Sequence, residues 1–160
     1  MCAVEARMRS LGIELPPASP PVNLTSGTKT VGNLVYVSAR APKVGGVPQY
    51  VGKVGAEIDE ADGARAARVA TLNALATLRE GIGDLDRIRQ IVKMTGYVNS
   101  APGFTNQHKV MNGATELLLE IFGERGHHAR ATIGVAELPL GNSVEVDLIV
   151  ELEAPATDAR

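Results

Sequence analysis

The sequence predicts an α+β fold in which a mixed β-sheet carries two helices on one face. Two segments, near residues 59–80 and 105–122, place apolar side chains at the spacing of an amphipathic helix. The runs around them are rich in β-branched residues and are bounded by Gly and Pro, which gives the order β-β-(β)-α-β-α-β-β. Helices layered on a sheet bury both apolar surfaces. No helix is left for the other face, so we expect self-association.

Length and composition indicate one domain over residues 1–160, with a short helix at 3–11, a core at 15–153 and a frayed tail at 154–160. The net charge is −2 with scattered charges, which disfavours a nucleic-acid surface. Cys2 is the only cysteine, so disulfides and cysteine metal sites are excluded. The chain has no apolar run of about 20 residues and no signal-peptide pattern. We therefore expect a cytoplasmic protein without membrane or nucleic-acid partners.

The N-terminal helix at 3–11 is followed by a proline-rich connector. Its apolar positions at helical spacing are Val4, Met8 and Leu11. The stretch 15–21 contains four prolines, and proline and the residue before it both resist helix. We expect this stretch to be extended and exposed.

A β-hairpin is predicted next. Residues 22–31 and 34–38 form its two arms, and the turn falls at Gly32-Asn33. Residues 39–55 are rich in Gly and Pro and are expected to form a loop or a ragged edge strand.

The longer predicted helices have clear ends. The first begins near Asp59, with acidic residues in its first turn, and is ended by Gly81 and Gly83. The second runs from about Thr105 to Phe122, with Gly123 as its C-cap. Their buried sides are expected at Val69, Leu72, Leu75, Ala76, Val110, Ala114, Leu117, Leu118 and Ile121.

Three strands complete the predicted sheet. One lies within 85–100, between the two helices. The other two form a strand–turn–strand unit within 126–153 that turns at Leu138–Gly141. In the last strand, one face carries Val144, Val146, Leu148 and Val150, and the other carries Glu145, Asp147, Ile149 and Glu151.

Arg130 and Glu145 are the candidate functional pair in this unit. Arg130 opens an otherwise uncharged strand, and a guanidinium at a mostly apolar site can hold a carboxylate through two parallel hydrogen bonds. If the two strands pair antiparallel, Glu145 lies near the same end. The alternative is a cross-strand ion pair that serves only the sheet.

Conventional catalytic and metal-binding signatures are missing. The sequence has no Gly-rich phosphate loop and no Gly-x-Ser-x-Gly elbow. His108, His127 and His128 include no helical i, i+4 pair, so we expect no metal. Taken alone, Asn112 reads as a local cap, Ser38 as a strand-end hydroxyl and Arg40 as a solvated charge.

A set of motifs in a fixed order changes this interpretation. The motifs are Gly32-Asn33-Leu34-Val35-Tyr36-Val37-Ser38, Ala66-Ala67-Arg68, Leu72-Asn73-Ala74-Leu75, Gly83-Asp84-Leu85, Val98-Asn99-Ser100-Ala101-Pro102-Gly103-Phe104, Gly126-His127-His128-Ala129-Arg130, and Leu138-Pro139 followed by Val144-Glu145-Val146. Over roughly Leu15 to Glu151, the chain resembles the reactive intermediate deaminase family, also called YjgF-like proteins. Asn112-Gly113 and the N-terminal helix resemble a subgroup whose substrates are mostly unassigned.

The resemblance implies a chorismate-mutase-like fold assembled as a homotrimer, with sites in clefts between subunits. It implies hydrolysis of enamines and imines, such as 2-aminoacrylate released by pyridoxal-phosphate enzymes, to 2-oxo acids and ammonia without a cofactor. The family's carboxylate-binding arginine falls on Arg130 and its water-handling glutamate on Glu145. Further substrate contacts are expected from Ser38, Ala39, Arg40, Asn112 and Thr132.

The sequence departs from the family pattern at two places. Ser38-Ala39-Arg40 replaces the frequent Ser-Gly-Gln, so glycine's freedom at positive φ is lost and a charge is added. A tyrosine common in the first strand is absent from residues 22–26. We therefore expect a substrate that differs from 2-aminoacrylate, bulkier or more acidic, with Arg40 reaching the cleft or facing solvent.

Three functions remain open from the sequence. The first is an imine or enamine deaminase acting on a small carboxylate. The second is a non-catalytic trimer that binds small carboxylates as a sensor or regulator. The third is an endoribonuclease that inhibits translation, which the acidic balance makes the least favoured.

Overall fold

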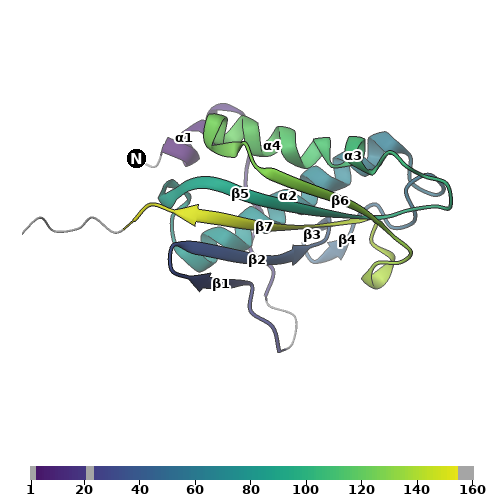
Figure 1. The fold of residues 1–160 in the computed structure, drawn as a ribbon, viewed down its shortest axis with the longest axis horizontal. Helices are drawn as coiled ribbons and strands as arrows, with labels where there is room; N and C mark the ends of the chain where they lie inside the picture. Colours follow the sequence, from purple (N-terminus) through teal and green to yellow (C-terminus); the bar gives the residue numbers. More distant parts are fainter. Residues whose placement is uncertain (1–2, 21–23, 155–160) are drawn as a thin grey trace, which may run out of the picture.

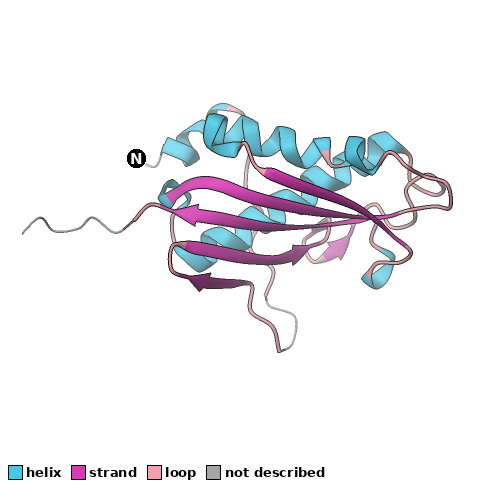
Figure 2. Cartoon of the chain, in the orientation of Figure 1, coloured by secondary structure: helices cyan, strands magenta, loops and turns pink. Residues whose placement is uncertain are grey.

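The computed structural model describes residues 3–20 and 24–154 and contains a five-stranded mixed sheet in the order β1-β2-β7-β5-β6 (Figures 1 and 2). Its strands are β1 Thr28–Val31, β2 Leu34–Arg40, β5 Ile88–Asn99, β6 Ala129–Val135 and β7 Val144–Leu152. Within the stretch expected to be a loop, β3 Lys43–Val44 and β4 Val47–Pro48 form a separate short hairpin. The expected frayed tail lies outside the described residues, except for Ala154.

The helices lie together on one face of the sheet. They are α1 Ala3–Ser10, α2 Glu60–Ile82, α3 Gln107–Val110 and α4 Asn112–Phe122. Figure 1 looks onto the sheet with α2 behind it and α4 alongside β6. Asp59 begins α2 by accepting a hydrogen bond from the Asp62 N–H at 2.7 Å, and the Gly83 N–H ends it on the Arg79 carbonyl. This confirms the α+β prediction and the first long helix; Gly81 lies inside that helix.

The second long helix is interrupted, contrary to the expectation of one helix over 105–122. Met111 ends α3 and precedes α4, which packs closely against α2. A Cβ at Gly113 would overlap the Ala64 carbonyl, so only glycine permits this approach of the two backbones. Asn112 and Gly113 are also poor helix formers, which favours a break at this point.

The core lies between the sheet and the helices. Val144, Val146, Leu148 and Val150 are at most 1% exposed, which confirms the predicted alternation of β7. Val4 and Met8 of α1 join this core, and the Asp86 carboxylate accepts hydrogen bonds from the first N–H groups of α1. Leu11 is 44% exposed because α1 ends at Ser10, one residue before it.

The last two strands, β6 and β7, do not pair with each other. Antiparallel pairing was the condition under which Arg130 and Glu145 would lie near the same end of the unit. β5 lies between β6 and β7, antiparallel to β7 and parallel to β6. The connection from β5 to β6 passes through α3 and α4, and such a crossover returns the chain beside the strand it left. Residues 136–143 then span the end of β5 to reach β7.

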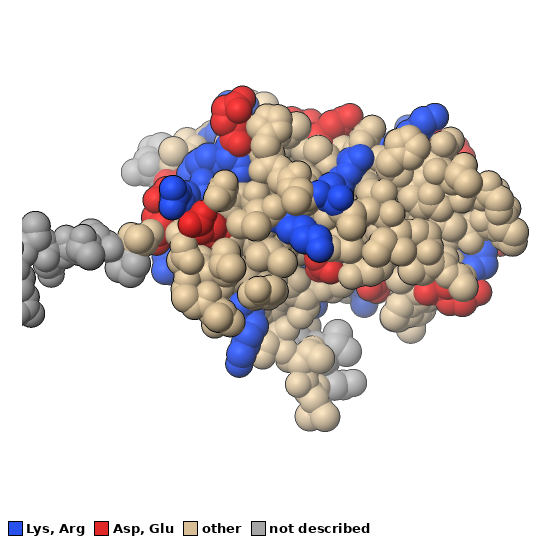
Figure 3. All heavy atoms as spheres, viewed as in Figure 1, with Lys and Arg blue, Asp and Glu red and all other residues tan. Residues whose placement is uncertain are grey.

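The other face of the sheet carries no helix among the described residues (Figure 1). On this open face the side chains of β7 are half-buried and alternate with its buried residues, whereas Tyr36 of β2 is 44% exposed. Figure 3 shows the same side of the molecule, with uncharged atoms over most of the surface and charges scattered between them.

Candidate functional site

Arg130 lies near the start of edge strand β6, and its side chain is held by α4. Nη1 donates to Asn112 Oδ1 at 2.9 Å and to Thr115 Oγ1 at 3.1 Å. Asn112 and Thr115 are separated by three residues, so they lie on one side of the helix. Arg130 forms no ion pair with any described carboxylate. The guanidinium is therefore oriented by neutral groups and exposed to an incoming anion.

His128 supports the same corner. Its Nδ1 lies 2.7 Å from the Gly126 carbonyl oxygen, and its Nε2 lies 3.3 Å from Thr115 Oγ1. Burial lowers the pKa of His128, and the positive charge of Arg130 acts in the same direction, whereas the Gly126 carbonyl opposes them. A neutral imidazole is therefore favoured beside the guanidinium. Sequence reasoning did not assign Thr115 or His128 to the site, although Thr115 follows Asn112 at helical spacing.

Glu145 lies on β7 and faces the open side of the sheet. Its neighbours Val144 and Val146 point into the core, so the carboxylate lies on the opposite side. Burial raises the pKa of Glu145, and the charge of Lys43 partly opposes the shift. Glu145 forms no ion pair among the described residues, which leaves a partly desolvated carboxylate without a fixed cation.

Tyr97 lies opposite Glu145 in the register of β5 and β7. Its hydroxyl donates to Asp147 Oδ2 at 3.0 Å. Burial raises the pKa of Tyr97, and the hydrogen bond to Asp147 and the charges of Asp147 and Glu145 add to this. Three ionisable side chains thus share the open face. Sequence reasoning placed Asp147 on the Glu145 face but gave Tyr97 no role, because strand register cannot be read from periodicity.

One chain does not bring Arg130 and Glu145 together. Arg130 is level with Met94, and through it with Leu148, whereas Glu145 is level with Tyr97. The two residues also differ in direction, because Arg130 contacts a helix and Glu145 faces the open side. Thr132 follows Arg130 on the same side of β6 and is half-buried. A cross-strand ion pair within one chain is therefore excluded by this register.

The Ser38-Ala39-Arg40 segment is irregular. The pairing of β2 with β7 shifts between Val37 and Arg40, as at a β-bulge. Ser38 donates from Oγ to the Ser26 carbonyl at 2.6 Å and from its N–H to the Gly27 carbonyl at 2.9 Å. Ala39 is half-buried and is not among the described non-glycine residues with positive φ, which are Tyr50 and Leu140. The loss of glycine at this position therefore causes no backbone strain.

The bulge turns Arg40 toward the helices and away from Glu145. Nε of Arg40 donates to Thr77 Oγ1 of α2 at 2.9 Å, and the residue is 8% exposed. Asn112, by contrast, contacts Arg130 directly. Of the seven predicted site residues, the structure thus gathers Arg130, Asn112 and Thr132 at one edge, while Glu145 and Arg40 lie elsewhere.

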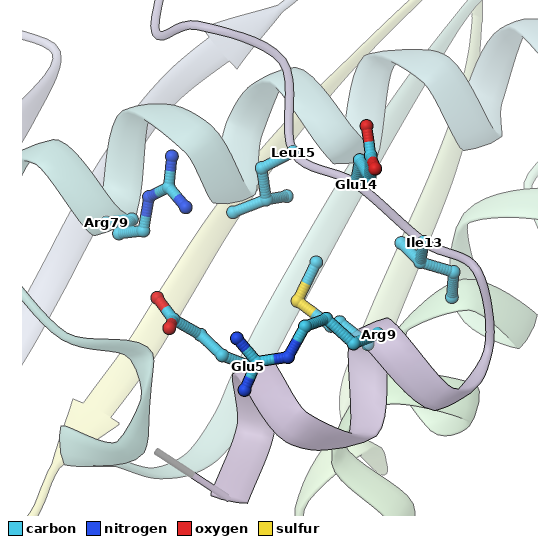
Figure 4. A pocket seen from close by; sticks show the side chains of 7 residues that line it. Glu5, Arg9, Ile13, Glu14, Leu15 and Arg79 are labelled. Atoms are coloured by element: carbon cyan, nitrogen blue, oxygen red, sulfur yellow. The ribbon is translucent and has the colours of Figure 1, made fainter. Parts of the chain in front are cut away.

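A cavity of about 300 Å³ lies between α1 and α2, distant in the chain from this site (Figure 4). It is lined by Glu5, Met8, Arg9, Ile13, Glu14, Leu15 and Arg79. Its charges are of both signs around an apolar floor, and none of these side chains forms an ion pair in the described part of the chain.

The described residues also contain no cluster of three or more metal ligands. No described helix is long and apolar enough to span a membrane.

Comparison with known proteins first defines the class of fold. A solved structure of RidA from the Antarctic bacterium Psychrobacter sp. aligns with 87% of this chain and 97% of its own at a TM-score of 0.60. Its identity is 23%, so it supports the shared fold alone. The protein thus shares the α+β fold of that structure, and the family model that matches this chain describes the fold class as chorismate-mutase-like.

The family follows from closer relatives. The family model described as "YjgF/chorismate mutase-like, putative endoribonuclease" matches residues 5–152. Protein TCP17 of Trypanosoma cruzi is 43% identical over 152 residues, covering 93% of this chain and 94% of that protein. The chain belongs to the YjgF family, which confirms the resemblance seen in its motifs.

Two solved structures are also similar. A protein of unknown function from Agrobacterium tumefaciens, Atu1372, is 41% identical at a TM-score of 0.86, with 94% and 93% of the two chains covered. A "putative endoribonuclease" from Shewanella oneidensis is 36% identical at a TM-score of 0.90, covering 93% of this chain and 99% of its own.

Proposed function

We propose that this protein is a deaminase that hydrolyses enamine or imine intermediates of small carboxylates to 2-oxo acids and ammonia. The observation that carries the proposal is the state of Arg130. It is held by Asn112 and Thr115, yet no described carboxylate neutralises it. A guanidinium oriented in this way suits the carboxylate of a small substrate.

A second copy of the chain completes the proposed site. Arg130 lies on an edge strand and Glu145 on the open face, so one protomer cannot present both to one small molecule. In a homotrimer, the open faces are covered and Arg130 of one subunit lies near the Glu145 carboxylate of its neighbour. Light scattering at micromolar concentration should give about three times the 16.8 kDa chain mass. A monomer of that mass would contradict the shared site.

The reaction needs only positioning and proton transfer. An enamine first takes a proton on its β-carbon to become the imine. Arg130 holds the substrate carboxylate while Glu145 accepts a proton from the attacking water, whose oxygen bonds to the imine carbon. That proton then passes to the nitrogen, which gives the carbinolamine. A second proton, from the carbinolamine hydroxyl, moves through Glu145 to the nitrogen as the C–N bond breaks and the C=O bond forms, so ammonia and the 2-oxo acid leave. The raised pKa of Glu145 makes its carboxylate a stronger base.

The substrate source is a pyridoxal-phosphate enzyme that releases 2-aminoacrylate or a related imine. No cofactor is needed in the proposed step itself, because water is the only co-reactant. The bulge at Ser38–Arg40 removes Arg40 from the open face, so we assign the substrate carboxylate to Arg130 alone. Within this site, Thr132 and Asn112 border the bound carboxylate.

The test is imine hydrolysis above the spontaneous rate. The imine is generated in situ by an amino-acid oxidase, and release of ammonia and 2-oxo acid is followed with and without the protein. Several imines accelerated by the wild type, with loss of the acceleration in Glu145→Gln, support the deaminase. Glu153→Gln is the matched control, because Glu153 follows the same strand and its side chain is exposed.

The alternatives give different outcomes. If 2-oxo acids bind but no imine is hydrolysed faster than in buffer, the protein is a carboxylate-binding trimer. Cleavage of RNA by the wild type, lost on replacement of Arg130 or Glu145, would favour the endoribonuclease suggested by the relatives' names. A net charge of −2 with no basic stripe does not favour that reading.

A further inference from the structure

Arg40 is a buried cation with no ion-pair partner in the described chain. The residue is 8% exposed, and its Nε donates to Thr77 Oγ1 at 2.9 Å. Nη2 is buried and has no acceptor among the described residues, and no described carboxylate lies within ion-pair distance. Buried charges in folded proteins are ordinarily paired in direct contact. This guanidinium has no such contact, and the opposite charge that acts on it is that of Glu80, at longer range.

Arg40 borders a polar cavity of about 280 Å³ between the start of β1 and the last turn of α2. The cavity is lined by hydroxyl groups and by one carboxylate. Its lining includes Ser26, Thr28, Arg40, Thr77 and Glu80. Glu80 is exposed and lies more than 4 Å from the guanidinium, so the two opposite charges face the same space without meeting.

The packing around Arg40 leaves one direction of approach. A Cβ on Gly27 would lie 2.8 Å from Thr77 Cγ2 and 3.1 Å from Arg40 Nη2, so the Gly27 backbone covers that side of the guanidinium. Thr77 occupies the Nε side. A ligand therefore reaches the charge from the cavity, where the hydroxyls of Ser26 and Thr28 are available to it.

We propose that this cavity binds a small free α-amino acid, with its carboxylate facing Arg40 and its ammonium facing Glu80. A simple anion would satisfy Arg40 but would be repelled by Glu80, and a simple cation would have the reverse difficulty. A zwitterion matches both charges, and the hydroxyl lining suits a polar side chain of one or two heavy atoms. This site is separate from the Arg130 site, and it does not depend on the proposed deaminase activity.

The two sites are distinct in the fold. Arg40 pairs with Val146 in the β2–β7 register and projects to the helix side, near β1. Arg130 lies on the edge strand β6, which β7 and β5 separate from β2. The proposed amino-acid site is therefore unaffected by the loss of the Arg130 side chain.

Calorimetric titration of the full chain tests the proposal with three matched probes. L-serine carries both charges, 3-hydroxypropionate lacks the ammonium, and ethanolamine lacks the carboxylate. The titrations are made in the Arg130→Gln background, which removes the carboxylate-binding guanidinium of the other site. We expect L-serine to bind this variant, and each truncated probe to bind it about tenfold more weakly or worse. Glu80→Gln should weaken L-serine by about tenfold and leave 3-hydroxypropionate unchanged or tighter.

Two further variants test the roles of Arg40 and Glu80 separately. Arg40→Gln should abolish L-serine binding; because that residue is buried, Glu80→Lys is the second variant. Glu80→Lys changes an exposed residue and should reverse the preference, so that 3-hydroxypropionate binds more tightly than L-serine. The proposal is overturned if L-serine does not bind Arg130→Gln, or if the Glu80 variants made in that background leave the probe order unchanged.

Discussion

Two arginines on separate strands of one sheet, β2 and the edge strand β6, have different environments. Arg130 is exposed on β6 and oriented by two neutral acceptors from α4. Arg40 is buried on β2 and keeps a single described hydrogen bond, to Thr77. An exposed guanidinium retains its hydration and can exchange it for a ligand at little cost, whereas a buried one has lost that hydration already. The first arrangement suits turnover, and the second suits retention of a bound charge.

The difference originates in strand geometry. β6 is an edge strand, and Arg130 near its start contacts α4 through Asn112. β2 pairs on both sides and contains a bulge, which rotates Arg40 into the core. Edges supply exposed sites, and bulges redirect side chains that alternation would leave outside.

The largest expected effect tests whether the proposed site of Arg130 and Glu145 is catalytic. Glu145→Gln removes the proton acceptor and should slow imine hydrolysis by about 10²–10⁴. Binding of an inert 2-oxo acid should be largely unchanged, because the water matters only as the reaction proceeds. Initial rates from the oxidase-coupled assay and calorimetric affinities give the two numbers. Equal rates in Glu145→Gln and wild type would contradict the mechanism even though the family assignment stands.

The second prediction contrasts the arginines directly. Arg130→Lys keeps the charge but loses the planar donor pair, so affinity for a 2-oxo acid should fall by about 1–3 kcal/mol. Arg40→Lys should leave that affinity unchanged, because Arg40 lies on β2, which β7 and β5 separate from β6. Calorimetry on both variants provides the comparison. Weaker 2-oxo acid binding in Arg40→Lys would mean that the cavity beside Arg40 is coupled to the Arg130 site.

Sequence patterns identified most of the elements and the core, but not the break between α3 and α4 or the order of the strands in the sheet. The alternation of Val144, Val146 and Leu148 identified the buried face of β7, and Asp59 marked the start of α2. Both are local signals, since each depends on residues a few positions apart. The insertion of β5 between β6 and β7 depends on a crossover through α4, which no local pattern encodes.

The candidate site shows the same limit. Arg130 was accessible to prediction as a lone charge in an apolar strand, and Asn112 was selected as a contact; the structure adds Thr115, three residues further along α4. The position of Arg40 was not accessible, because a bulge of one residue reverses the side on which a strand residue lies. The Tyr97–Asp147 hydrogen bond likewise requires the β5–β7 register.

The third prediction concerns stability in the absence of ligand. Arg40→Met replaces a buried unpaired charge by an apolar chain of similar reach, and Thr77 Oγ1 still donates to the Asn73 carbonyl at 3.0 Å. The free energy of unfolding should rise by about 1 kcal/mol, whereas Arg130→Met should change it by less than about 0.5 kcal/mol. Urea denaturation of both variants measures the difference. A loss above about 2 kcal/mol in Arg40→Met would show that Glu80 already neutralises Arg40 in solution.

The smallest expected effect is a pH dependence that separates Glu145 from an ordinary surface carboxylate. Its folded pKa is raised by burial, so the folded state disfavours the charged form relative to the unfolded chain. The free energy of unfolding is therefore highest below the unfolded pKa, about 4.3, where Glu145 is neutral in both states. It falls as the pH rises through the folded pKa. Glu145→Gln should therefore be more stable than wild type at pH 7 and equal to it near pH 4.

Glu153→Gln, at an exposed glutamate beyond the same strand, should show no such divergence. The measurement is urea denaturation of the three proteins across this range. If the Glu145→Gln and wild-type curves stay parallel between pH 4 and 7, the carboxylate is fully solvated, and its basicity contributes nothing beyond that of a surface glutamate.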